Sequence, residues 1–165
     1  CLGGIIVRNQ TERLYLFNPF NLKGWENQQI KDQLDLLIEK YDEDADTMSG
    51  LALNIENLAN QNVLIGEMIS RLTEEHICMK ARLEANENIA IVTCRSNWDG
   101  EGKPPAMKFF EAQAASLYED DRKELAKKES DLKRFKIAYD AIGEKINAIK
   151  KRMEAIKYEI TGGLN

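Results

Sequence analysis

The sequence is poor in the residues that break helices and in those that build common metal sites. Its 165 residues include three prolines, three cysteines and one histidine. So little proline removes the strongest helix breaker. A single histidine, with no cysteine pair at ligand spacing, excludes the usual zinc motifs, so no metal is expected. An odd number of unpaired cysteines argues against a disulfide framework, and we expect a reducing, cytoplasmic setting.

Long apolar runs and catalytic motifs are also missing. No uninterrupted apolar stretch reaches about 18 residues, which argues against a membrane span. The apolar residues 1–7 lack a basic lead, so they are not expected to be a signal peptide. The sequence has no glycine-rich phosphate loop, no Gly-x-Ser-x-Gly and no His-Glu-x-x-His. We therefore expect neither an enzyme nor a bound cofactor.

Charge, by contrast, is abundant and unevenly distributed. Charged residues make up 31% of the chain, a composition typical of long helices. Residues 1–102 carry a net charge of −8 and residues 103–165 a net charge of +3. The segment 122–157 holds twelve basic and six acidic residues. This basic segment could contact phosphate, or it could complement the acidic first half of the chain.

A hydrophobic repeat with alternating steps of three and four residues runs through the first half of the chain. It predicts a helix over 26–94 whose seam packs against another helix. Gly50 and the acidic cluster 42–46 offer an alternative, in which the helix is split into 26–41 and 46–94. The repeat, called the first seam here, consists of Ile30, Leu34, Leu37, Tyr41, Asp44, Met48, Leu51, Ile55, Leu58, Asn62, Ile65, Ile69, Leu72, His76, Met79, Leu83, Asn86, Ala90 and Thr93.

A glycine- and proline-containing stretch at 95–105 predicts a loop, and a second helix is expected over 106–160. A short loop makes two long helices antiparallel neighbours. Folding about it pairs positions whose numbers total about 200, such as Leu51 with Ile149 and His76 with Glu124. The second seam consists of Leu125, Lys128, Leu132, Phe135, Tyr139, Ile142, Ile146, Ile149, Met153, Ile156 and Ile160.

The expected fold is therefore all-α: a long antiparallel helical hairpin of the coiled-coil type over 25–165. Small residues flank the first seam and widen its apolar stripe beyond what one partner helix can bury. We expect the hairpins to assemble into an oligomeric bundle or ring. Residues 1–24 are predicted to be a strand-like or extended arm, either a β-hairpin or a segment that packs on a neighbouring subunit. The flanking small residues are Ala45, Ala52, Ala59 and Gly66.

Three polar residues interrupt the first seam. His76 could be a metal ligand or a pH sensor. The favoured interpretation is structural, because one buried polar residue can specify the register of a helix pair. Asn62 and Asn86 are interpreted in the same way.

The loop carries Arg95, Trp98 and Lys103, a combination that suits single-stranded nucleic acid, since bases stack on aromatics and phosphates pair with cations. The alternative is that Trp98 closes the hairpin end by packing on Phe109 or Phe110. The basic residues of the second helix could likewise track a phosphate backbone or pair with acids of the first helix. Those acids include Glu67, Glu74 and Glu75.

The segment Met79-Lys80-Ala81-Arg82-Leu83, a polar loop, and a long helix with Ala141–Arg152 resemble the UvsY-type recombination mediators of bacteriophages. The resemblance covers about residues 45–160. It implies a helical ring that binds single-stranded DNA and loads a RecA-like recombinase. It also adds candidate DNA-binding residues to those of the loop, namely Lys80, Arg82, Lys150, Lys151 and Arg152.

Two functional hypotheses follow from the sequence. The first is a non-enzymatic phage-type accessory protein that binds single-stranded DNA and helps to load a recombinase. The second is a structural or interaction protein, such as a virion assembly component or a prefoldin-like chaperone, with no nucleic-acid binding. In both, the chain is expected to be a homo-oligomer without a membrane partner.

Overall fold

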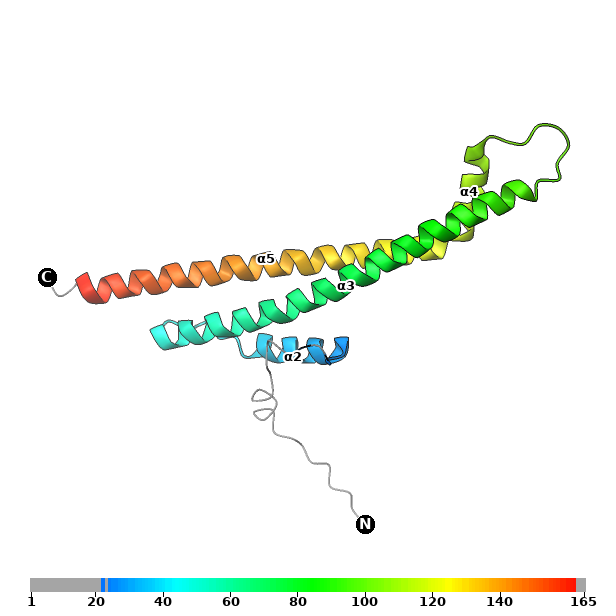
Figure 1. Cartoon of the computed structure of the whole chain (residues 1–165). Helices are drawn as coiled ribbons and strands as arrows, with labels where there is room; N and C mark the ends of the chain where they lie inside the picture. Colours follow the sequence, from blue (N-terminus) through cyan, green and yellow to red (C-terminus); the bar gives the residue numbers. More distant parts are fainter. Residues whose placement is uncertain (1–21, 23, 163–165) are drawn as a thin grey trace, which may run out of the picture. The chain divides into compact units, whose positions relative to one another are not determined.

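Over the residues that it describes, Leu22 and 24–162, the computed structural model has helices as its only regular secondary structure (Figure 1). The elements are α2 at Asn27–Glu39, α3 at Met48–Ser96, α4 at Met107–Leu117 and α5 at Glu119–Gly162. The predicted arm at 1–24 falls, apart from Leu22 and Gly24, outside the described residues. None of the helices in the described part combines the length and apolar character that a bilayer crossing requires.

The first predicted helix is split, with a link of eight residues between α2 and α3. Thr47 caps the start of α3, because its hydroxyl Oγ1 accepts a hydrogen bond from the Gly50 amide at 3.1 Å. Its carbonyl accepts another from the Leu51 amide at 2.9 Å. The alternative in which the first helix is split into 26–41 and 46–94 is therefore confirmed to within a few residues, although the acidic cluster 42–46 lies in the link and the first turn of α3 contains no acidic residue.

The second predicted helix, 106–160, is also wrong as one continuous element. It is interrupted at Tyr118, whose φ of −114° and ψ of 26° depart from helical geometry. The first turn of α5 carries Glu119, Asp120 and Asp121. Carboxylates favour the positive end of the helix dipole, which stabilises a new helix start at this point.

The chain forms two compact units. The helices α3 and α5 are each divided between them, with one part in unit 1 and the other in unit 2. Unit 1 contains the described residues of 1–67 and 141–165, and unit 2 contains 68–140. The core of unit 1 includes Leu51, Leu58 and Ile149, which are all less than a tenth exposed. The predicted proximity of Leu51 and Ile149 is confirmed, because they belong to one buried cluster. Around it pack Tyr41, Ile55, Ile142, Ile146, Met153 and Ile156.

Three amides on α3 form a polar row in unit 1 that ties the α2 end to α3. Asn57 Nδ2 donates to the Leu37 carbonyl at 2.9 Å, near the C-terminus of α2. Asn54 Nδ2 donates to the Asp42 carbonyl at 2.6 Å, and its Oδ1 accepts from the Asp42 amide at 3.2 Å. Gln61 Nε2 donates to Asn57 Oδ1 at 2.7 Å. The row satisfies backbone groups that the end of α2 would otherwise leave unpaired.

In unit 2, ion pairs show that the segments of α3 and α5 run antiparallel. Lys128 Nζ lies 2.7 Å from Glu75 Oε2, and Arg122 pairs with Glu87 farther along α3. The residue numbers of these pairs total 203 and 209. The predicted total for facing residues was about 200. The observed totals are larger and increase toward the loop, so the register of the two helices differs from the predicted one.

Candidate interaction surfaces

Two cations of α5 in unit 2 are held by acids of α3. Hydrogen bonding to Glu75 raises the pKa of Lys128, and hydrogen bonding to Glu87 raises that of Arg122. Both charged forms are therefore favoured by their partners. The basic residues of the second helix were interpreted either as phosphate contacts or as partners of acids on the first helix. At these two positions they are partners of acids.

The loop end of unit 2 is closed by three aromatic rings. The Trp98 ring lies 6.4 Å from both Phe109 and Phe110, edge to face, and the two phenylalanines are 5.6 Å apart. Phe110 is almost fully buried, whereas Trp98 retains 37% of its exposure. A Cβ on Gly100 would overlap the indole, so this glycine lets the backbone lie directly against Trp98. The predicted packing of Trp98 on Phe109 or Phe110 is confirmed for both rings.

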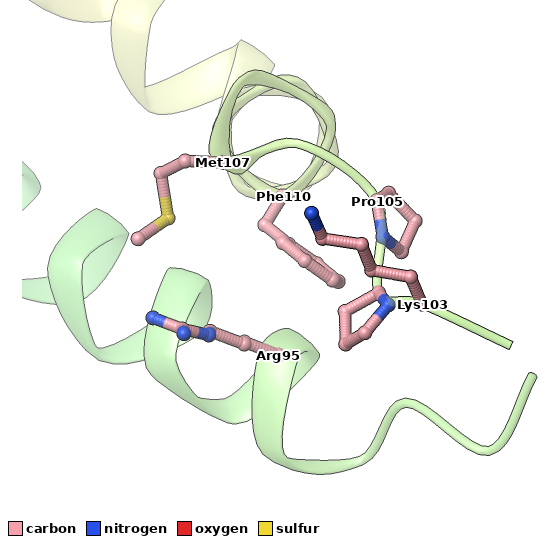
Figure 2. Close-up of a pocket in the computed structure, with 6 residues that line it drawn as sticks. Arg95, Lys103, Pro105, Met107 and Phe110 are labelled. Atoms are coloured by element: carbon pink, nitrogen blue, oxygen red, sulfur yellow. The ribbon is translucent and has the colours of Figure 1, made fainter.

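Beside these rings, a cavity of about 270 Å³ opens between the end of α3, the loop and α4. Figure 2 shows the Phe110 ring toward the middle of the lining residues, with Arg95 on one side and Lys103 on the other. Neither cation forms an ion pair within the described residues. Two cations that flank this cavity could hold an anionic group, with the partly exposed Trp98 ring beside them. The remaining lining residues are Pro104, Pro105 and Met107.

A second surface runs along α3 in unit 2, on the face turned away from the α5 contact. The seam side of this segment is buried, as the 7% exposure of Met79 and Leu83 shows. On the opposite side, Ile77, Ile89 and Val92 are 60–65% exposed. A helix that lies on a core usually has one apolar stripe, and this segment has two. We call the second stripe the outer face; it consists of Ile77, Ala81, Ala85, Ile89 and Val92, all exposed.

The other predicted DNA-binding residues lie apart from the cavity. In unit 2, Lys80 lies 4.0 Å from Glu84 on the same helix. Arg82 lines a different cavity, together with Glu75, Glu124 and Lys128. The remaining three, Lys150, Lys151 and Arg152, are exposed on the α5 segment of unit 1. Of the predicted set, the structure thus brings together Arg95 and Lys103 in one cavity, with Trp98 beside them.

The polar interruptions of the first seam lie at half-buried positions. Asn62 Oδ1 is buried and has no hydrogen-bond partner among the residues that the structure describes, and the side chains of His76 and Asn86 are half-buried. Nothing resembling a metal-ligand cluster of three His, Cys, Asp or Glu side chains occurs among the described residues. The structural interpretation of these three residues stays a prediction.

Sequence reasoning missed the polar row of Asn54, Asn57 and Gln61, and it missed the outer face. The row consists of amides, which give no apolar period, although Asn54 and Gln61 are less than a tenth exposed. The outer face was hidden because a search for one seam assigns the remaining apolar residues to solvent. A helical plot of 77–92 would have shown apolar residues on two opposite sides.

Comparison with protein-family models, with curated proteins and with solved structures gave no match.

Proposed function

We propose that this chain is a non-enzymatic interaction protein whose α3 binds another helix along its outer face. The observation that supports the proposal is the exposure of Ile77, Ile89 and Val92 opposite a seam that is already packed. Burying apolar area is favourable by about 25 cal/mol per Å², so such a stripe gains free energy when it is covered. Helix-on-helix docking suits it, because its members recur at steps of three and four residues.

Photo-crosslinking tests this function directly. A benzoylphenylalanine at Ala81 or Ile89 should yield protein adducts in cells that express the chain, because a partner helix would cover these positions. The matched control is the same probe at Lys133, an exposed position on α5 in the same unit. Equal adduct yields at Ala81 and Lys133 would contradict the proposal.

A second function, binding of single-stranded DNA, is favoured by the cavity of Figure 2. There Arg95 and Lys103 would pair with phosphates, and an unstacked base would lie against the partly exposed Trp98 ring beside the cavity. The resemblance to UvsY-type mediators would extend this function to assembly as a ring and to loading of a recombinase. This activity rests on Arg95 and Lys103, whereas the outer face rests mainly on apolar side chains, so substitutions of those apolar side chains test the outer face alone.

The DNA-binding test uses a fluorescent oligothymidine and measures its anisotropy at several salt concentrations. The double charge reversal Arg95→Glu with Lys103→Glu should abolish binding at low salt. Lys123→Glu is the control, because Lys123 is exposed but already paired with Glu119 at 2.7 Å. If the charge reversal and the control bind alike, or if the unmodified chain does not bind at low salt, this second function is wrong.

A further inference from the structure

The outer face of α3 is complementary to itself when a second copy is turned end for end. An antiparallel arrangement about Ala85 brings together positions whose residue numbers total 169 or 170. Ala81 then lies opposite Ile89 of the second copy, and Ile77 lies opposite Val92. Ala81 leaves room for the larger Ile89, and Ile77 meets Val92, so apolar side chains face one another along the stripe.

Ala85 lies opposite its own equivalent in this arrangement. With a methyl side chain on each copy, the two helices can approach closely at the two-fold axis. The pairing is the same from either copy, which is what an isologous dimer interface requires.

The charges at the ends of the outer face support the same direction. Glu74 and Arg95 are both exposed, and neither forms an ion pair within the described residues. Their numbers total 169, so an antiparallel copy places each beside the other. A parallel copy would place Glu74 beside Glu74 and Arg95 beside Arg95, and like charges in contact are unfavourable. It would also set Ile89 against Ile89 and leave gaps between the alanines.

We propose that the helix that covers the outer face is α3 of a second copy of this chain, antiparallel and centred on Ala85. This inference rests on the proposed function, since it names the partner of the same surface. It excludes a different protein as the main occupant. The cavity at the loop end contributes Arg95 to the proposed contact with Glu74 of the second copy.

Disulfide trapping tests the register. In a chain with Cys1→Ser, Cys78→Ala and Cys94→Ala, the added substitution Ala85→Cys should give a disulfide-linked dimer on mild oxidation, because only position 85 faces itself. Ala81→Cys is the matched control and should stay unlinked, whereas a mixture of Ala81→Cys with Ile89→Cys should form a mixed dimer. Linking of Ala81→Cys as readily as Ala85→Cys would indicate a parallel pair and overturn the proposal.

Sedimentation of the full chain tests the same interface without cysteines. Ala85→Arg should convert the dimer to a monomer with an unchanged helical circular dichroism signal. Glu74→Lys should weaken the dimer, and adding Arg95→Glu should restore it. A monomeric unmodified chain would overturn the second copy as partner. Adducts to a different protein in the photo-crosslinking experiment would then still support the proposed function. An absence of adducts would contradict both the proposed function and the proposed dimer.

Discussion

Asn54 shows how one side chain can fix the path of the chain between two helices. Its amide makes two hydrogen bonds with the backbone of Asp42, twelve residues earlier. In a continuous helix, the backbone groups of Asp42 would pair with those of neighbouring turns. Here the side-chain amide of Asn54 pairs with them instead. The side chain is only 4% exposed, so both hydrogen bonds are largely shielded from solvent.

Asn54→Ala is therefore expected to lower the free energy of unfolding by about 2 kcal/mol, because it leaves the Asp42 amide without its partner and the Asp42 carbonyl with only the 3.4 Å bond from the Ala45 amide. Urea denaturation followed by circular dichroism measures the change. Asn60→Ala is the matched control on the same helix, since the Asn60 side chain makes no hydrogen bond within the described part of the chain. A difference between the two variants below about 0.5 kcal/mol would contradict this account.

Gly100 is the second position where one residue decides the local structure. Gly100→Ala should displace the Trp98 indole from Phe109 and Phe110, since the added Cβ would overlap the ring. Tryptophan fluorescence, measured in a Trp25→Phe background, should shift toward longer wavelength. Gly143→Ala is the control, because its added Cβ meets open space. It should leave the emission unchanged and stabilise the chain by up to about 1 kcal/mol.

At the scale of the helices, opposite charges on α3 and α5 hold the segments of unit 2 in register. Glu75 and Lys128 approach within 2.7 Å and keep substantial exposure. Exposed pairs of this kind contribute little individually. Their importance lies in alignment, because sliding one helix past the other would separate both this pair and Arg122 from Glu87.

A double-mutant cycle of Glu75→Gln and Lys128→Met should give a coupling energy of about 0.5 kcal/mol at low salt, measured by urea denaturation near neutral pH. The hydrogen bond to Glu75 raises the folded-state pKa of Lys128 above its ordinary value of 10.5. The contribution of the pair is thus complete below that value and declines as the pH rises through the higher folded-state pKa. A coupling energy that is unchanged at strongly alkaline pH would contradict this origin.

At the scale of the whole molecule, the two proposed interactions differ in their dependence on salt: DNA binding depends on it strongly and the dimer weakly. The chain carries a net charge of −5, so a polyanion would bind only through local cations such as Arg95 and Lys103. The proposed dimer instead buries mainly Ile, Val and Ala side chains, and added salt screens only its Glu74–Arg95 contacts.

Binding of oligothymidine is therefore expected to weaken with a log–log salt slope of about −0.7 for each contacted phosphate. The dimer dissociation constant should change by less than about tenfold over the same salt range, because screening affects only its few charge pairs. Fluorescence anisotropy and sedimentation equilibrium give the two quantities on one preparation. A dimer whose dissociation follows the DNA slope would contradict an apolar interface.

The predicted seam identified much of the core. Leu51, Leu58, Met79 and Leu83 were assigned to the first seam and are buried. The same pattern was wrong where it ran without a break through 40–47. Asp44 and Met48 are exposed there, because the link follows hydrogen bonds to Thr47 and Asn54 rather than a helical path. Of the candidate site, the loop residues were found, but the outer face was not.

The sequence by itself determined that this protein is helical and where its main apolar stripe lies, because helix periodicity is a local property of residues three and four apart. The tertiary structure decided where the helices end and which stripe is covered. These features depend on contacts between distant residues, such as Asn57 with Leu37 and Lys128 with Glu75. An apolar stripe has the same sequence pattern whether or not another helix covers it. Only the folded chain shows that Ile77, Ile89 and Val92 remain exposed.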